Sequence, residues 1–156
     1  MFFSTFKYGN LKSVFKFNTK NIDINTCKEN NYSFLLITGI AKTDDLKMYL
    51  NEFSEEIIHL KYFDHHYYSK KDIQNIVRKF NSIENKNKII ITTEKDAMRI
   101  KESPELNQHE EIKSLCYYIP IEVEFLNDHQ DDFDKLILRY VCKDKKPNIL
   151  KIKTIN

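Results

Sequence analysis

Short apolar runs alternate with polar segments along the chain, and the alternation becomes regular from Ser33 onward. A short continuous apolar run is typical of a strand that is covered on both faces of its sheet. Such a run predicts a strand at 34–37, and the apolar segments that follow predict strands at 56–62 and 88–92 and a further strand within 115–125 that is interrupted at Pro120. We therefore expect a sheet of mostly buried strands.

The polar segments between these runs carry apolar residues at the spacing of one helix face. The first two faces are Leu46, Tyr49, Leu50 and Phe53, and then Ile73, Ile76, Val77, Phe80 and Ile83. Ser69 with Asp72 forms a variant of the capping box at the start of the second helix. A third helix is predicted to open at 93–97 and to end before Pro104, and the last helix covers about 130–142.

Both ends of the chain break this regularity. Aromatic residues in 2–8 and 13–17, with a turn signal between them, predict a short β-hairpin or two short strands. Residues 18–32 are polar and lack a helical stripe, so we expect a loop or an irregular strand there. In the basic end, residues 143–156, an alternation of apolar and basic residues predicts a final strand.

Strands that alternate with helices at this spacing predict right-handed crossovers and a mostly parallel sheet with helices on both faces. The expected fold class is α/β, a Rossmann-like three-layer arrangement preceded by the short β-hairpin. We expect two parts, a hairpin and linker segment at residues 1–32 and the α/β domain at residues 33–156.

The amino-acid composition indicates a globular protein and argues against several other classes. With 156 residues, 41% of them hydrophobic and 31% charged, the chain is long enough for a domain with a real core. A formal charge of +2 does not indicate a basic surface that would bind nucleic acid. The three cysteines lack a C-x-x-C pair, which indicates a reducing compartment and no structural zinc. No apolar run approaches the roughly 20 residues of a membrane helix, so we expect a soluble, cytosolic protein.

The glycine content excludes two nucleotide-binding motifs. The chain has only Gly9 and Gly39, and neither a P-loop nor a dinucleotide fingerprint can be written with them. The chain therefore has no nucleotide-phosphate loop of its own.

Three polar motifs directly follow three successive predicted strands. They lie at 38–41, 64–66 and 92–96. Ligands bind at the carboxyl edge of open parallel sheets, so the three motifs together predict a site at that edge.

The chemistry of Asp64, His65 and His66 stays open at this point. Adjacent histidines point in different directions on an extended backbone, so both rarely bind one metal ion. A histidine beside a carboxylate suits proton transfer, because the carboxylate fixes its tautomer. We favour a functional role over a solvated loop, since perturbed titrating groups cluster at functional sites.

The other two motifs have strong structural interpretations. Thr93 can cap a helix, Glu94 and Asp96 can lie in its first turn, and Lys95 can pair with a carboxylate. The same helix start would also favour an anion, but spacing alone favours the structural role. Gly39 is expected to serve the tight strand-to-helix turn rather than a close approach to a substrate or a partner domain.

Five motifs together resemble a known family. They are I-T-G-I-A at 37–41, F-D-H-H-Y-Y-S at 63–69, I-I-I-T-T-E-K-D-A at 89–97, P-I-E-V-E-F-L at 120–126 and the opening F-F-S-T-F-K-Y-G at 2–9. In order and spacing they look like the C-terminal half of tetraacyldisaccharide 4'-kinase, the lipid A pathway kinase of Gram-negative bacteria. The resemblance covers nearly the whole chain.

The resemblance implies transfer of the ATP γ-phosphate to the 4'-hydroxyl of a tetraacyldisaccharide 1-phosphate at the cytoplasmic face of the inner membrane. It assigns the catalytic histidine to His65, with Asp64 and His66 in support, and leaves His66 as the alternative histidine. Gly39, Thr93, Glu94, Lys95 and Asp96 are further supporting candidates. ATP and Mg²⁺ would be held by an N-terminal P-loop lobe that this chain lacks, so the isolated chain is expected to hold no cofactor and to be inactive.

Two other interpretations are kept. Manganese-dependent Asp-His-His phosphoesterases also place such a triplet after a strand, but they need upstream metal-binding acids and a glycine-rich motif, which Gly9 and Gly39 cannot form. Alternatively, the chain is a non-catalytic docking domain for a separate P-loop subunit.

Overall fold

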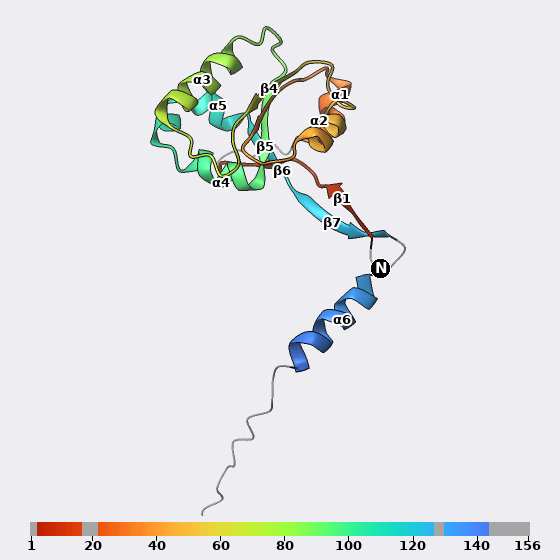
Figure 1. Cartoon of the computed structure of the whole chain (residues 1–156). Coiled ribbons are helices and arrows are strands. Elements are labelled where there is room, and N and C mark those ends of the chain that lie inside the picture. Colours follow the sequence, from red (N-terminus) through yellow and green to blue (C-terminus); the bar gives the residue numbers. More distant parts are fainter. Residues whose placement is uncertain (1–2, 17–21, 127–129, 144–156) are drawn as a thin grey trace, which may run out of the picture. The chain divides into compact units, whose positions relative to one another are not determined.

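The computed structural model describes residues 3–16, 22–126 and 130–143. The chain divides into two compact units. One unit holds residues 8–122, and the other combines the residues up to Lys7 with those from Val123 onward. The first unit contains a five-stranded sheet and the helices that cover it (Figure 1).

The five-stranded sheet has the strand order β2-β6-β5-β3-β4. Its strands are β2 Lys12–Ser13, β3 Ser33–Thr38, β4 Ile57–Lys61, β5 Lys88–Thr93 and β6 Cys116–Ile119. The last four run parallel to their neighbours, and β2 is antiparallel to β6. β3 is central, with Leu36 opposite His59 on one side and Ile91 on the other. The predicted mostly parallel sheet is confirmed.

Helices cover both faces of this sheet (Figure 1). They are α1 Ile24–Glu29, α2 Asp44–Leu50, α3 Lys70–Asn81, α4 Glu94–Lys101 and α5 Glu110–Ser114, with a 3₁₀ turn at Pro104–Gln108. Alternate residues of β3 belong to different cores, because side chains alternate across a strand. Phe34 and Leu36 pack with α1 and α2, whereas Leu35 and Ile37 pack with α3, α4 and α5.

Helix α3 begins where the sequence predicts it. The Ser69 side chain accepts a hydrogen bond from the Asp72 N–H at 3.3 Å, and the Asp72 carboxylate accepts one from the Ser69 N–H at 2.9 Å. This reciprocal cap satisfies two backbone donors that the first helical turn leaves free. The predicted face is buried through Ile73, Ile76 and Phe80.

Two short strands are present at the start of the chain, as predicted, but the alternative prediction that they form a β-hairpin is wrong. Strand β1 (Ser4–Tyr8) pairs with β7 (Ile121–Phe125) in a separate two-stranded sheet, and β2 pairs with β6. The turn signal at 8–10 indicated a local reversal, but the Gly9 N–H donates to the Pro120 carbonyl at 2.9 Å instead. The chain therefore pairs with residues that are distant in sequence. The predicted interruption at Pro120, between β6 and β7, is confirmed.

The polar segment before β3 contains a helix, although its sequence pattern predicts a loop or an irregular strand. Asp23 caps α1 by accepting a hydrogen bond from the Asn25 N–H at 2.9 Å, as short polar side chains do at helix starts. Ile24 and Cys27 of this helix are buried, as are Leu11 and Val14 before it. These residues therefore belong to the core of the α/β unit rather than to a leading linker.

The second unit contains most of the β1–β7 sheet and helix α6 (Gln130–Lys143), which confirms the predicted last helix. Lys7 and Glu124 form an ion pair across the two strands at 3.6 Å. The ring centroids of Phe125 and Phe133 lie 4.8 Å apart. The strand expected in the basic end falls, from residue 144 onward, outside the described residues. Across the described part, no helix is both long and apolar enough to cross a membrane.

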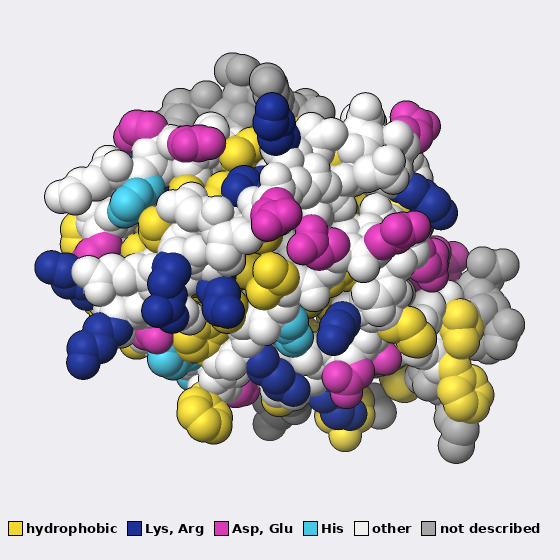
Figure 2. Space-filling view, turned by 90° about the horizontal axis from the view of Figure 1, so that it is seen from above, with side chains coloured by type: hydrophobic (Ala, Val, Ile, Leu, Met, Phe, Trp, Pro, Cys, Tyr) yellow, Lys and Arg dark blue, Asp and Glu magenta, His cyan; other side chains and the backbone are white. Residues whose placement is uncertain are grey.

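Positive and negative side chains are interspersed over the face shown in Figure 2. This mixture agrees with the formal charge of +2. It gives no reason to expect a polyanion on that face.

Candidate active site

The three polar motifs meet at the carboxyl edge of the sheet. Strands β4, β3 and β5 are neighbours and run parallel, so their last residues Lys61, Thr38 and Thr93 lie at the same edge. The Gly39 N–H donates to Asp96 at 2.8 Å, and Lys95 Nζ donates to Asp64 at 3.0 Å. The structure thus brings all three predicted motifs into direct contact.

Asp96 joins the first and third motifs from a fully buried position. Its Oδ2 atom accepts hydrogen bonds from the Gly39 N–H at 2.8 Å and from Thr93 Oγ1 at 2.7 Å. Thr93 is the N-cap of α4 and accepts a hydrogen bond in return from the Asp96 N–H. The Oδ1 atom lies 3.8 Å from Arg99 Nη1. Burial, together with the charge of Asp96, raises the pKa of the neighbouring Tyr68 hydroxyl.

Gly39 is required by a close contact rather than by its backbone conformation. Gly39 lies between β3 and α2, where the strand-to-helix turn is expected, but neither glycine of the chain has a positive φ. A Cβ atom at position 39 would lie 2.8 Å from Asp96 Oδ1 and 3.3 Å from the Phe63 carbonyl oxygen. The absent side chain is what allows the buried carboxylate to reach the loop after β3.

We expect Gly39→Ala to lower the free energy of unfolding by about 1–3 kcal/mol, as overpacking of a buried site does. Urea titration of the chain measures this change. Gly9→Ala is the matched control, since a Cβ atom there meets only Pro120 at an ordinary 3.4 Å. Equal stabilities of the two variants would show that Asp96 moves aside at no cost.

Asp64, His65 and His66 lie in a tight turn after β4. The turn is closed by a hydrogen bond from the His66 N–H to the Phe63 carbonyl at 3.1 Å. His65 has a φ of 62°, a left-handed conformation that costs free energy in a residue other than glycine and is found at functional sites. Asp64 supports the turn by accepting from the His65 N–H at 2.9 Å.

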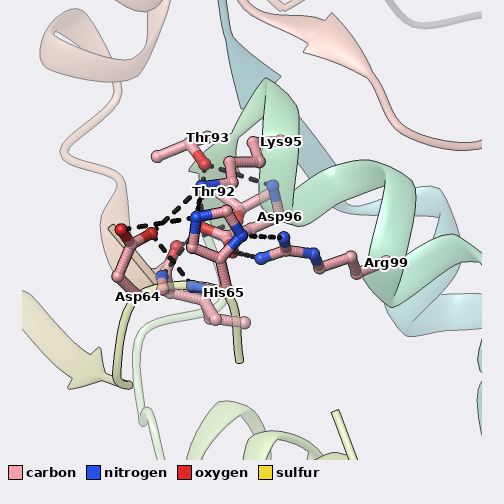
Figure 3. A network of polar contacts seen from close by, with 9 residues as sticks. Asp64, His65, Thr92, Thr93, Lys95, Asp96 and Arg99 are labelled. Carbon is pink, nitrogen blue, oxygen red and sulfur yellow. Dashed lines mark hydrogen bonds and ion pairs between the residues drawn. The ribbon is translucent and has the colours of Figure 1, made fainter. Parts of the chain in front are cut away.

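The His65 ring is exposed and lies among three charged side chains (Figure 3). Its Nε2 atom is 3.4 Å from Lys95 Nζ and 3.7 Å from Asp64 Oδ2. Its Nδ1 atom is 3.3 Å from Arg99 Nη2. The arrangement presents an imidazole to solvent with a carboxylate on one nitrogen and cations on both.

His66 points away from this cluster and has a structural environment. Its Nε2 atom lies 3.1 Å from the Asp72 carboxylate, which caps α3. Its ring stacks on Tyr62 with centroids 4.6 Å apart and meets Tyr68 edge-on at 5.2 Å. Of the two adjacent histidines, His65 is the one whose ring is available to a ligand.

Lys95 keeps the Asp64 carboxylate ionised. The hydrogen bond from Lys95 is the main cause that lowers the pKa of Asp64 below its usual value, and the charge of His65 lowers it further. A lowered pKa in the folded state favours folding above the unfolded pKa of about 4. That contribution is lost as the pH falls through the lower folded-state value.

We expect Lys95→Met to raise the pKa of Asp64 toward its ordinary value, because the main stabilising donor is removed. A carbon-13 titration of the side-chain carboxyl groups measures the shift. Lys101→Met, an exposed lysine on the same helix, should leave the Asp64 titration unchanged. An unchanged Asp64 pKa in Lys95→Met would contradict the assigned contact.

One candidate residue, Glu94, lies apart from the histidine turn, and one residue that was not a candidate, Arg99, lies beside it. Glu94 is exposed and lines a hollow of about 410 Å³ together with Ile40, Met98 and Ile121. No hydrogen bond or ion pair found in the described part joins Glu94 to the histidine turn. Arg99 was not predicted, although it follows Asp96 by three positions and Lys95 by four, a spacing that places all three on one side of α4.

Within the residues that the structure describes, no group of three or more His, Cys, Asp or Glu side chains could hold a metal ion. His59 lies apart from the turn, in β4, where its Nε2 atom is 2.8 Å from Thr38 Oγ1. Burial and the nearby lysines lower the pKa of His59.

Comparison with known proteins gives a consistent result. The model of the family described as tetraacyldisaccharide-1-P 4'-kinase matches residues 6–141. The tetraacyldisaccharide 4'-kinases of Bacteroides thetaiotaomicron and Bacteroides fragilis are 40% and 38% identical over 147 and 148 residues, each covering 90% of this chain. That of Phocaeicola vulgatus is 33% identical over 146 residues, or 94% of the chain.

The chain spans only 37–39% of the length of these relatives. A crystal structure of LpxK from Aquifex aeolicus in complex with ATP is also similar, with a TM-score of 0.48 and 15% identity. The similar region covers 88% of this chain and 35% of that one.

Proposed function

The chain belongs to the tetraacyldisaccharide-1-P 4'-kinase family, and on that premise we propose that it forms the C-terminal lobe of a lipid A 4'-kinase. The reaction is transfer of the ATP γ-phosphate to the 4'-hydroxyl of a tetraacyldisaccharide 1-phosphate. The observation that carries the proposal is the exposed His65 ring at the carboxyl edge, held among Asp64, Lys95 and Arg99. Phosphoryl transfer depends mainly on positioning and charge stabilisation, and this arrangement offers both.

In this proposal His65 is the catalytic histidine. Its exposed ring can contact an acceptor hydroxyl or an aspartate from the other lobe, and so orient the hydroxyl or move its proton. Asp64 and Lys95 form an ion pair that fixes the turn beside the ring. His66 supports the turn through Asp72 and the tyrosine rings.

The nucleotide is assigned to a different part of the enzyme. Gly9 and Gly39 cannot supply a phosphate-binding loop, so ATP and Mg²⁺ are held by an N-terminal P-loop lobe. This chain then completes the active site without binding the nucleotide alone. We place the assembled enzyme at the cytoplasmic face of the inner membrane, where the lipid acceptor is found.

A chimeric kinase tests this function. The segment of the Bacteroides thetaiotaomicron kinase that aligns with this chain, 147 residues long, is replaced by the matching residues of this chain. We expect the chimera to phosphorylate the acceptor with ATP at the 4' position, and the isolated chain to be inactive. The product is followed by mass spectrometry.

Two results would contradict the proposal. One is a chimera that folds and binds ATP but transfers no phosphate. The other is phosphorylation of the acceptor by the isolated chain, which would mean that the nucleotide site lies within it. The unmodified Bacteroides enzyme is the positive control.

A further inference from the structure

We propose that Arg99 is a positioning residue that selects the tautomer of His65. Its guanidinium donates to Nδ1 of His65 and thereby keeps the ring proton of the neutral imidazole on Nε2. The inference concerns the site of the proposed kinase and deepens that proposal. It makes Arg99 part of a functional unit that the motifs of the sequence do not indicate.

The two terminal nitrogens of Arg99 face two different neighbours, Asp96 and His65. Nη1 lies 3.8 Å from the buried Asp96 Oδ1, and Nη2 lies 3.3 Å from Nδ1 of His65. The guanidinium is planar and rigid and has no acceptor. Whichever end of the guanidinium faces the ring, it can only present N–H groups to it. A nitrogen that faces a donor must use its lone pair, so Nδ1 accepts.

Lys95 does not oppose this assignment. Its Nζ atom is 3.4 Å from Nε2 of His65, but it donates to Asp64 Oδ1 at a shorter 3.0 Å. An ammonium group on a flexible stem can turn its hydrogens toward that carboxylate. A proton on Nε2 then faces the second oxygen of Asp64, at 3.7 Å. The opposite tautomer would place an N–H group against the fixed Arg99 donor.

The consequence is a histidine that donates through Nε2. The Nε2–H group lies beside Asp64 on the exposed ring, where a carboxylate or an acceptor oxygen of the substrate can accept its hydrogen bond. Of the two roles proposed for His65, this tautomer supports orientation of the hydroxyl, because neither ring nitrogen is then free to take its proton. Asp96 acts on the ring only indirectly, because its carboxylate attracts Arg99 across 3.8 Å. This links the buried cap of α4 to the exposed ring.

The test is nitrogen-15 spectroscopy of the histidine rings in the 156-residue chain, at a pH where the imidazoles are neutral. We expect His65 to show a pyridine-type Nδ1 signal and a pyrrole-type Nε2 signal. In Arg99→Met, which removes the donor, these signals should shift toward a mixture of tautomers. Arg99→Lys, which keeps a donor, should retain part of the preference. A His65→Asn sample assigns the His65 signals.

Two controls separate tautomer selection from folding. The His66 ring, held by Asp72 at 3.1 Å, should be unchanged in every Arg99 variant. Arg78→Met removes an exposed arginine of α3 that bonds to Asn75 and should leave His65 unchanged. If Arg99 had only a structural role, Arg99→Met would lower the urea midpoint of the chain without moving the His65 signals.

The proposal is overturned if His65 carries its proton on Nδ1 in the unchanged chain, a result that needs no variant. It is also overturned if a folded Arg99→Met protein keeps the same tautomer. Neither measurement needs kinase activity. An inactive chimera would therefore contradict the proposed function while leaving this inference intact. Conversely, a His65 proton on Nδ1 would overturn this inference while leaving the proposed function intact.

Discussion

Asp96→Ala should lower the free energy of unfolding of the chain by about 3 kcal/mol. Leaving one buried polar group without a partner costs about 1–3 kcal/mol, and this change deprives the Gly39 N–H and the Thr93 hydroxyl of their acceptor. The contact with Arg99 adds little to this loss, because Nη1 lies 3.8 Å from the carboxylate and Arg99, which is 25% exposed, can turn toward water.

Urea unfolding of three variants measures this effect. Asp96→Asn keeps one acceptor oxygen and should lose less than Asp96→Ala. Glu94→Ala is the matched control, because Glu94 is an exposed acid in the same first turn of α4 and contributes at most about 1 kcal/mol through the helix dipole. If Asp96→Ala were no less stable than Glu94→Ala, the buried carboxylate would not hold the two motifs together.

The strong burial of Asp96 was not predictable from the sequence. Glu94, Lys95 and Asp96 all suit the solvated first turn of a helix, and composition does not tell which of them turns inward. The structure selects Asp96 because Gly39 leaves room for it at 2.8 Å from where a Cβ would be. The fit between two strand ends depends on the tertiary structure. The pattern of residues within a single segment does not predict it.

The position of the site was predictable for a simple reason. Strands β3, β4 and β5 alternate with helices along the chain, so their parallel direction follows from the strand–helix–strand pattern. Polar residues after each strand must then share one edge. Strand pairing at the ends was not predictable in this way, because β1 finds its partner β7 more than a hundred residues along the chain.

The environments of the two adjacent histidines could not be predicted from the sequence. The family resemblance favours His65 by motif position and leaves His66 as the alternative, but it does not show how either ring is packed. His65 has a positive φ and an exposed ring, while the ring of His66 lies against Tyr62 and Asp72. Two adjacent histidines thus have one exposed ring and one packed ring.

The same substitution at these two positions should therefore have opposite effects in the chimeric kinase. We expect His65→Asn to lower kcat by about 10²–10⁴-fold, the usual contribution of a positioned acid or base, while the urea midpoint changes little. Asparagine tolerates positive φ better than most residues, so the turn is kept. His66→Asn should leave kcat within about tenfold of the unchanged chimera.

His66→Asn should instead destabilise the protein by about 1–3 kcal/mol, because it removes a hydrogen bond to Asp72 and the ring contacts with Tyr62 and Tyr68. Steady-state kinetics and urea unfolding of both variants give the four values needed. The reverse pattern, a loss of kcat in His66→Asn with His65→Asn active, would move the catalytic role to His66. In that case the exposed ring among Asp64, Lys95 and Arg99 would have a function other than phosphoryl transfer.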